Sequence, residues 1–343
     1  MQMLRKNPVN TRGVEKNTKI FKTGIRLFFK VLSCDMARKR KNKRKFRKYV
    51  LKCLTNTRYS GIICQKKQDV EKGEADMSIK VSRCVDIISK DERATISNRY
   101  HKITKAINQE FWNSSSDTLH SIYVGSYGRG TAISTSDIDM LVEIPEREFE
   151  RYDFQKGNGQ SRFLQAVKNA IVGAYPHSDI HADGQVVVID FKDSIKFEVV
   201  PAFRNEDWLG NVTYTYPDSN MGGNWKSTNP KAEQEAINEK DKNSGGLLKD
   251  TCKVIRFVRD NYYTSYHLSG ILIDAFAYDA IQGWHYLSKG EQSFDSGITY
   301  EQALLNYYNK YPIPVIFAPG SKMPIDISRG WDVLGKILKR MVD

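Results

Sequence analysis

The chain has 343 residues, of which 40% are apolar, 11% aromatic and 27% charged, a composition typical of a globular protein with one large or two small domains. Its formal charge of +13 suggests a nucleic-acid binder, but the excess lies in residues 1–76, which hold 22 basic and 6 acidic side chains. The remainder holds 31 basic and 34 acidic side chains. This near-neutral body argues against a basic channel for a nucleic-acid strand.

The N-terminal segment contains a dense basic run, with nine Lys or Arg in the eleven positions from Arg38 to Lys48. Blocks of like charge repel each other, so we expect residues 1–76 to be a disordered extension that binds nucleic acid or a membrane surface. The apolar-basic stretch 20–32 could form an interfacial helix, but it is too short and too charged to span a bilayer. Alternatively, the natural start is Met77, where the composition changes abruptly.

The five cysteines form no Cys-x-x-Cys pair, and no His/Cys cluster has the spacing of a zinc site. His177 and His181 are four residues apart, and we interpret them as ordinary loop histidines. This cysteine usage predicts a cytoplasmic protein.

The first predicted element after the basic segment is an amphipathic helix over 91–112, because apolar residues recur there at spacings of three and four. Its inward face consists of Ile96, Tyr100, Ile103, Ile107 and Phe111. The elements expected next are a strand at 121–124, a Gly-Ser turn, a strand opening with Asp137-Ile138-Asp139, a helix at 161–175, and strands at 185–191 and 195–200, the last ended by Pro201.

Residues 204–246 are polar and rich in Gly, Asn and Pro, which predicts mostly loop with a helical piece at 231–237. The helices expected after it are 247–262, 270–287, 300–310 and 329–342, and in the first of these Leu248, Thr251, Ile255, Val258 and Tyr262 form the inward face. The sequence therefore predicts an α/β (α+β) fold in which a sheet carries the carboxylates and a mostly helical C-terminal lobe forms a cleft with it. We expect domain boundaries at 1–76, 77–203 and 204–343.

The stretch 125–139 is the most informative part of the chain, because a Gly-Ser turn precedes two carboxylates spaced i, i+2. On a strand, Asp137 and Asp139 point to the same face. Two carboxylates that close repel each other unless a cation lies between them, and oxygen ligands beside a Gly-rich turn suit Mg²⁺ bound with substrate phosphates. This pattern predicts a metal-dependent phosphoryl- or nucleotidyl-transfer site.

Nucleotidyl transfer by two metal ions requires a third carboxylate from a neighbouring strand. Glu198 is the lone charge in the apolar run Phe197–Pro201, and burial of an unpaired carboxylate is costly, so it faces either solvent or metal. Asp190, at the end of the preceding strand, is the rival; we favour Glu198. In this hypothesis Asp137, Asp139 and Glu198 are the catalytic metal ligands, and Gly125 and Ser126 hold the β- and γ-phosphates.

Three basic residues, Lys249, Lys253 and Arg256, lie at i, i+4 and i+7 on the predicted outer face of the helix 247–262. Lys249 and Lys253 could clamp a triphosphate; the alternative is a solvated helix face. The aromatic residues Tyr216 and Trp225 could stack on a nucleobase or simply anchor a loop. Arg129 contacts either phosphate or solvent.

The chain resembles the polymerase-β-type nucleotidyltransferases in its Gly-Ser turn, its Asp-x-Asp pair and the acidic residue in a strand ending Val-Val-Pro-Ala-Phe. It is more closely similar to the bacterial CD-NTases (cGAS/DncV-like enzymes), relatives of the oligoadenylate synthetases. The similar stretches are Gly-Ser-Tyr-Gly-Arg-Gly-Thr-Ala-Ile, Ser-Asp-Ile-Asp-Met-Leu-Val and, downstream, Gly223–Pro230. The resemblance runs from about Met77 to the mid 280s. Glu198 departs mildly from the Asp that many members carry there.

The resemblance implies a polymerase-β-type domain with a mixed sheet and two Mg²⁺ ions, for which Mn²⁺ can substitute. It further implies synthesis of a cyclic or short linear oligonucleotide second messenger from NTPs in CBASS anti-phage signalling, where the product activates a partner effector protein. Two alternatives are a nucleotidyltransferase that acts on RNA, protein or a small molecule, and an inactive nucleic-acid-binding relative. The latter predicts salt-dependent binding through residues 1–76 and no NTP turnover.

Overall fold

The computed structural model describes residues 79–83, 88–289, 291, 296–312 and 314–343. The chain divides into two compact units, Met1–Ile63 and Cys64–Asp343, and every helix and strand described below belongs to the second. The basic segment, and with it the expectation of a disordered extension, lies outside the described residues. Among the described residues, no helix is both long enough and apolar enough to cross a membrane.

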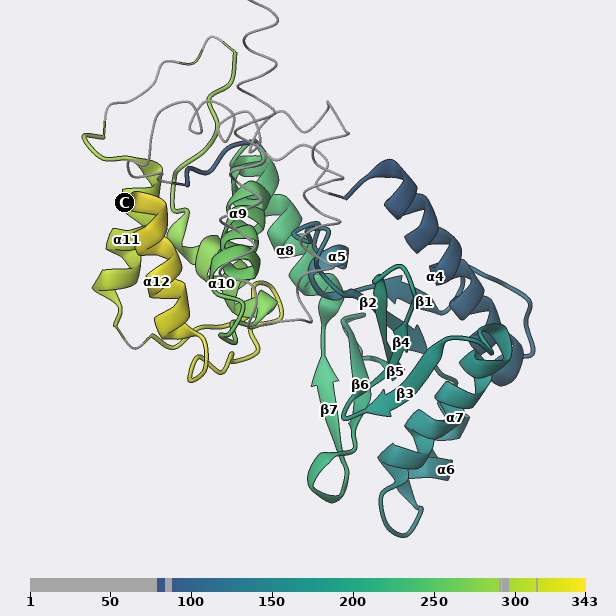
Figure 1. The fold of residues 1–343 in the computed structure, drawn as a ribbon. Helices are drawn as coiled ribbons and strands as arrows, with labels where there is room; N and C mark the ends of the chain where they lie inside the picture. Colours follow the sequence, from purple (N-terminus) through teal and green to yellow (C-terminus); the bar gives the residue numbers. More distant parts are fainter. Residues whose placement is uncertain (1–78, 84–87, 290, 292–295, 313) are drawn as a thin grey trace, which may run out of the picture. The chain divides into compact units, whose positions relative to one another are not determined.

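A seven-stranded mixed sheet organises the N-terminal half of the described chain (Figure 1). Five strands run in the order β1-β2-β5-β4-β3, while β6 pairs with β5 and β7 with β6. The strands are β1 Ser121–Tyr123, β2 Ile138–Glu143, β3 Asp179–Asp183, β4 Val186–Asp190, β5 Lys196–Glu206, β6 Val212–Asp218 and β7 Asn224–Thr228. Strands β2 and β5 are parallel and the other pairs antiparallel, which confirms the predicted α/β class with a mixed sheet.

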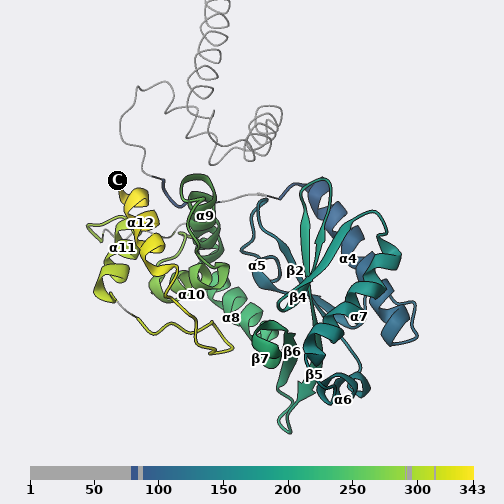
Figure 2. The same ribbon diagram turned by 60° about the horizontal axis from the view of Figure 1, so that its bottom comes forward.

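Two long helices, α4 (Lys90–Phe111) and α7 (Gly159–Ala174), cover one face of this sheet (Figure 2). Helix α4 begins at a capping box, in which the Ser89 hydroxyl accepts from the Glu92 N–H and the Glu92 carboxylate accepts from the Ser89 N–H. The predicted inward face of this helix is buried, which confirms it. Burial of such apolar side chains is the main free energy that holds these helices on the sheet.

The remaining α-helices are α5 Gly125–Gly128, α6 Arg147–Asp153, α8 Pro230–Asn243, α9 Leu247–Tyr262, α10 Gly270–Ala280, α11 Tyr300–Lys310 and α12 Trp331–Val342. From α8 onward they lie close to the ranges predicted from the sequence. Of the predicted inward face of α9, four residues are buried and Tyr262 is 38% exposed. Helix α10 ends at Ala280 rather than at 287.

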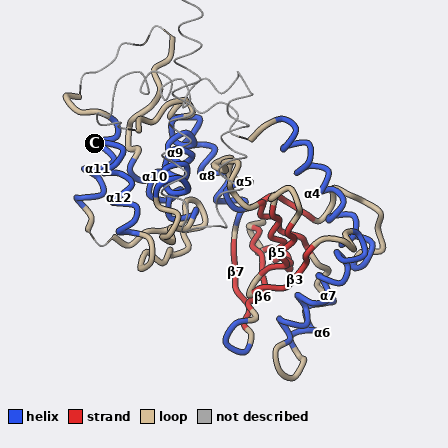
Figure 3. Tube along the Cα trace, viewed as in Figure 1, coloured by secondary structure: helices blue, strands red, loops and turns tan. Residues whose placement is uncertain are grey.

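The prediction that residues 204–246 are mostly loop was wrong, because β6 and β7 form a hairpin there (Figure 3). Strand β5 also continues past Pro201, which was expected to end it. Pairing of β5 with β4 stops at Val199 and pairing with β6 starts at Phe203. Among the described strands, β5 at Pro201 therefore pairs with β2 alone. Because no strand lies on the opposite edge of β5 at this position, the missing N–H of the proline removes no hydrogen bond there.

Strand β3 was not predicted, and it places His181 in a strand rather than in a loop. Among the described residues this strand pairs only with β4, at the end of the five-strand path. Its five residues alternate between polar and apolar, with Ile180 and Ala182 as the apolar positions, of which Ile180 is buried. This short alternation is the strand signal that was missed, because one large apolar side chain carries most of it.

Candidate active site

The carboxylates Asp139 and Glu198 lie side by side on the parallel strands β2 and β5, where they are register partners. Register partners project to the same face of a sheet, and Asp137, two residues before Asp139, shares that face. Their neighbours Met140 and Val199 point the opposite way, into the core beneath α4 and α7. The fold thus brings the three predicted metal ligands together on the sheet face that those helices leave open.

The electrostatics of Asp139 reflect this crowding. Burial, followed by the negative charges of Glu198 and Asp137, raises the pKa of Asp139 to about 7. The positive charges of Arg129 and Lys196 act in the opposite direction. A carboxylate in this environment gains most from a cation placed among the three groups.

Lys196 already occupies part of this space, and sequence reasoning missed it. Its Nζ lies 2.5 Å from Oε1 of Glu198 and 3.5 Å from Oδ2 of Asp137. Burial lowers the pKa of Lys196, but the hydrogen bond with Glu198 and the charge of Asp137 outweigh it, so the pKa is raised. An ammonium group held between Asp137, just before β2, and Glu198 in β5 is consistent with a donor set for a metal ion with a preference for oxygen ligands. The available signal was its position two residues before Glu198 on the same strand face.

Lys196→Met is expected to raise the affinity for divalent cations about three- to fivefold. The variant removes an ammonium group that competes with a metal ion for the carboxylates, and its partly exposed ion pairs are worth roughly 1 kcal/mol. A Mn²⁺ titration followed by electron paramagnetic resonance measures this affinity in the unmutated chain and in the variant. Lys192→Met, at an exposed lysine four residues away, is the matched control and should leave Mn²⁺ affinity unchanged. Weaker Mn²⁺ binding in Lys196→Met would contradict competition.

The Gly-Ser turn packs directly against Asp139. Gly125 has a φ of +58°, and a Cβ at this position would lie 1.9 Å from Oδ2 of Asp139. The preceding Val124 donates its N–H to the Asp139 carbonyl at 3.0 Å. Only glycine combines this backbone conformation with so close an approach, so the turn and the carboxylate form one unit. Ser126 follows in α5 and is half-buried.

The two predicted lysines of α9 differ in their surroundings. Lys249 packs beside the end of the Gly-Ser loop, because a Cβ on Gly130 would lie 3.2 Å from its Cε. Its Nζ donates to Oδ1 of Asn238 at 2.7 Å. Lys253 forms an ion pair with Asp250 of the same helix, at 3.9 Å. Lys249 is thus the lysine that the fold brings to the turn.

The two aromatic candidates also differ. Tyr216, in β6, is half-buried and packs with Val124, Leu141 and Tyr214, and burial raises its pKa. Leu141 shares the sheet face of Asp139, so Tyr216 lies on the carboxylate side. Trp225 instead joins an aromatic cluster beneath the sheet and donates its Nε1–H to Asp153 at 2.8 Å. Trp225 therefore anchors β7, the second of the two interpretations.

The rival third carboxylate, Asp190, belongs to a different group. In register it lies opposite Lys196, whereas Val188 lies opposite Glu198. Asp190 is exposed. Its carboxylate lies near the carboxylate of Asp179 and the imidazole of His181, and the potential ligand atoms of these three groups are within 4.8 Å of one another. The geometry favours Glu198 as the partner of Asp139.

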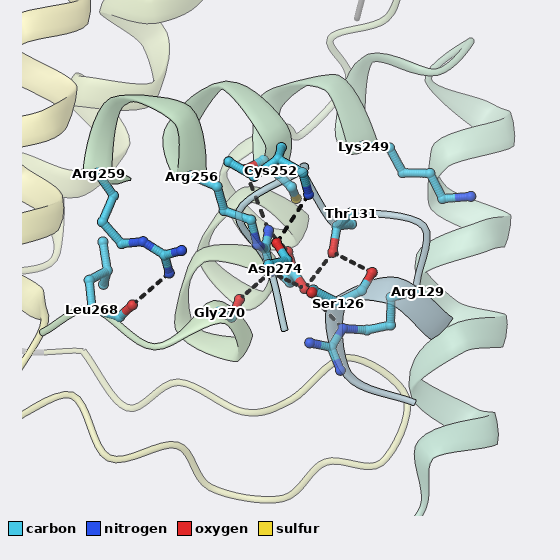
Figure 4. Close-up of polar contacts among 12 residues, drawn as sticks. Ser126, Arg129, Thr131, Lys249, Cys252, Arg256, Arg259, Leu268, Gly270 and Asp274 are labelled. Carbon is cyan, nitrogen blue, oxygen red and sulfur yellow. Dashed lines mark hydrogen bonds and ion pairs between the residues drawn. The ribbon is translucent and has the colours of Figure 1, made fainter. Parts of the chain in front are cut away.

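The prediction that Arg256 lies on the outer face of its helix was wrong. Its side chain is 1% exposed, because both terminal nitrogens bind the carboxylate of Asp274 in α10 (Figure 4). Arg129 is likewise buried, with ion pairs to the same carboxylate and to that of Glu233. The signal for this cluster was Asp274 itself, which with Asp279 is one of two charges in an otherwise apolar helix.

Comparisons with known proteins agree with this geometry. Residues 80–241 match the family model for the Second Messenger Oligonucleotide or Dinucleotide Synthetase domain (SMODS). A probable cyclic nucleotide synthase of Bacillus cereus (strain VD146) is 27% identical over 122 residues, which is 34% of this chain and 36% of that relative. The match thus spans little more than a third of the relative's length.

Solved structures share the fold at low sequence identity. The Vibrio cholerae cyclic AMP-GMP synthase DncV has a TM-score of 0.53 and 14% identity over 74% of this chain and 84% of its own. A CdnE cyclic dinucleotide synthase of Elizabethkingia meningoseptica has a TM-score of 0.50 and 14% identity over 74% and 97% of the two chains. The resemblance to bacterial CD-NTases is thereby confirmed for part of the chain: residues 80–241 match the SMODS family model, and the chain shares its fold with DncV and with this CdnE.

Proposed function

We propose that this chain is a metal-dependent nucleotidyltransferase that joins NTPs into a cyclic or short linear oligonucleotide second messenger. The observation that carries the proposal is the pairing of Asp139 with Glu198 on adjacent parallel strands, with Gly125 packed against Asp139. These residues lie within the stretch that matches the SMODS family. The activities of the similar proteins, cyclic AMP-GMP synthesis by DncV and probable cyclic nucleotide synthesis by the Bacillus cereus relative, support the same reaction class.

In the proposed mechanism Asp137, Asp139 and Glu198 hold two Mg²⁺ ions, for which Mn²⁺ can substitute. The bound ions would supply Lewis acidity toward the triphosphate and lower the pKa of the attacking hydroxyl. Glu198 helps to take up the proton of that hydroxyl. These groups are fixed before the reaction, so little reorganisation is required when charge develops.

The remaining candidate residues bind and orient the nucleotide. The backbone N–H groups and hydroxyl of the Gly125-Ser126 turn would hold the β- and γ-phosphates, since no Cβ keeps them away. Lys249, which packs beside Gly130, would contact the triphosphate, and Lys253 one helical turn later would extend this clamp. Tyr216, on the carboxylate side of the sheet, would stack on a base.

The test is incubation of the full chain with all four NTPs and Mg²⁺ or Mn²⁺, with products identified by mass spectrometry and Asp139→Ala run in parallel. A phosphatase-resistant di- or trinucleotide made only by the unmutated chain would support messenger synthesis and identify the bases. Extension of an added RNA would favour a tailing enzyme. NTP binding without any product in the presence of either ion would contradict the proposed activity.

The partners follow from the proposed reaction. NTPs are the substrates, and the oligonucleotide product would activate an effector protein in a CBASS defence system. We place the protein in the cytoplasm, as its cysteine usage indicates.

Residues 1–76 are proposed to be the sole nucleic-acid-binding part of the chain, separate from catalysis. A protein that begins at Met77 is expected to retain full synthesis and to lose salt-dependent binding of duplex DNA, since the body of the chain is near neutral. Product yield and fluorescence anisotropy at two salt concentrations check both halves of this prediction. Loss of synthesis would instead assign the segment a part in the mechanism.

A further inference from the structure

Four hydrogen bonds from buried side chains converge on the carboxylate of Asp274 in α10 (Figure 4). Oδ1 accepts from Nη1 of Arg256 at 2.6 Å, and Oδ2 accepts from Nη2 of Arg256 at 2.9 Å, from Nε of Arg129 at 2.9 Å and from the Thr131 hydroxyl at 3.0 Å. Burial raises the pKa of Asp274, but Arg256 and then Arg129 overcome it and lower the pKa to about 2. The carboxylate is therefore ionised, and its position is tightly determined.

Two of these donors belong to the segment that closes the Gly-Ser turn. The Arg129 N–H donates to the Gly125 carbonyl at 3.1 Å, and the Thr131 N–H donates to the Ser126 carbonyl at 2.9 Å. The Thr131 hydroxyl has one proton, and Asp274 at 3.0 Å, being charged, is a better acceptor than the Ser126 carbonyl at 3.4 Å. The backbone of this segment thus holds the turn, while its side chains hold Asp274.

The other side of the network belongs to α9. Arg256 of α9 binds Asp274 with both terminal nitrogens, and Lys249, two helical turns earlier on the same helix, packs beside Gly130. A helix of this kind is a rigid spacer. The Arg256–Asp274 contact therefore sets where Lys249 stands relative to the Gly125-Ser126 turn.

Stability alone does not explain these buried charges. Well-packed apolar residues of similar volume are often as stabilising as a buried ion cluster or more so, because the desolvation cost is large. What a cluster of directional hydrogen bonds adds is a defined geometry. Here that geometry joins α5, α9 and α10, and Nη1 of Arg129 extends it to Glu233 of α8 at 3.0 Å.

We propose that Asp274, together with Thr131, Arg129 and Arg256, is a positioning network for the triphosphate subsite. The network holds the Gly125-Ser126 turn at a fixed separation from Lys249, so that both can contact one triphosphate. Its members act through the turn and the helix and do not touch the nucleotide. The inference rests on the proposed function, since the subsite is that of an NTP substrate.

Thr131→Val is the sharpest test, because it removes one hydroxyl and keeps the side-chain shape. We expect non-hydrolysable ATP and GTP analogues to bind roughly fivefold or more weakly, near the lower end of typical coupling between sites, while binding of AMP and GMP changes little. The KM for NTPs should rise with a smaller change in kcat. Isothermal titration calorimetry on the full chain and steady-state kinetics measure these quantities.

Thr251→Val is the matched control, since Thr251 is also fully buried and its hydroxyl donates to the Leu247 carbonyl at 2.7 Å, outside the network. It should lower the melting temperature about as much as Thr131→Val without selective loss of triphosphate binding. A second variant, Arg256→Lys, keeps the charge but loses the two-nitrogen fork and should also weaken triphosphate binding selectively.

Equal triphosphate affinity in Thr131→Val, Thr251→Val and the unmutated chain would overturn the positioning role while leaving the proposed function in place. An equal loss for triphosphates and monophosphates would also overturn it, because that pattern indicates a general structural defect. If the unmutated chain binds no NTP analogue, the proposed function fails and the positioning role fails with it.

Discussion

Asp139→Asn is expected to abolish oligonucleotide synthesis and, in the same protein, to raise the stability of the metal-free fold. The amide has nearly the same shape as the carboxyl, so the contact with Gly125 is retained while the negatively charged ligand is lost. We expect the rate to fall by at least about 1,000-fold, on the order of 4 kcal/mol of transition-state stabilisation. Product yield by mass spectrometry, with and without added Mn²⁺, measures this loss.

The stability effect follows from the raised pKa of Asp139. Between the ordinary pKa of 3.8 and about 7, the carboxyl is ionised in the unfolded chain but protonated in the folded one. The folded state therefore binds more protons, and the free energy of unfolding falls as the pH rises through this window, then levels off. A shift of this size corresponds to a free energy on the order of 4 kcal/mol, which Asp139→Asn should recover above pH 7.

Thermal unfolding in the presence of EDTA at pH 5 and pH 8 checks this prediction. The difference in melting temperature between Asp139→Asn and the unmutated chain should be larger at pH 8. A difference that shrinks with rising pH would show that Asp139 is not destabilised by burial and by its neighbours. Full synthesis by this variant would exclude Asp139 as a metal ligand.

The third ligand can be assigned by a matched pair of variants. Glu198→Gln should lose synthesis nearly as completely as Asp139→Asn, because Glu198 is the register partner of Asp139. Asp190→Asn changes an exposed carboxylate on the neighbouring strand and should leave synthesis unchanged. The reverse pattern would move the third ligand to Asp190.

Much of this site could be predicted from the sequence, because its parts are local. The i, i+2 spacing of Asp137 and Asp139 on a strand fixes their common face without any tertiary information. Glu198 was found because a single charge in an apolar run needs a partner. What the sequence could not supply is the register that sets Glu198 beside Asp139, since that depends on the pairing of β2 and β5, some sixty residues apart.

The misses have equally specific causes. Polar composition concealed β6, although Tyr214 and Tyr216 alternate there with threonines as in a strand. Arg256 was assigned to the outer face of its helix because helical spacing alone ranks an arginine as exposed. Its burial requires Asp274 from another helix, and that contact is set by tertiary packing. Lys196 was overlooked for the same reason, as its role depends on carboxylates from two strands.

Gly125→Ala is expected to lower the rate of synthesis about 100-fold or more. A Cβ at this position would meet Oδ2 of Asp139 at 1.9 Å, so the carboxylate or the turn must move. Displacement of a catalytic group by about 1 Å can cost on the order of 10²-fold in rate. Mn²⁺ affinity should fall in parallel, because the same carboxylate is a proposed metal ligand, and electron paramagnetic resonance measures it directly.

Backbone strain alone must be separated from displacement of the carboxylate, because alanine at a positive φ costs roughly 1–2 kcal/mol wherever it occurs. Gly210 provides the control: its φ is +81°, but a Cβ there would have no atom within 4 Å. Gly210→Ala should therefore lose stability much as Gly125→Ala does, yet keep full synthesis and Mn²⁺ affinity. If the two variants lose synthesis equally, strain rather than the contact with Asp139 explains the effect. If Gly125→Ala keeps both synthesis and Mn²⁺ affinity, the turn can yield without moving Asp139, and glycine is required there neither for the carboxylate nor for the phosphates.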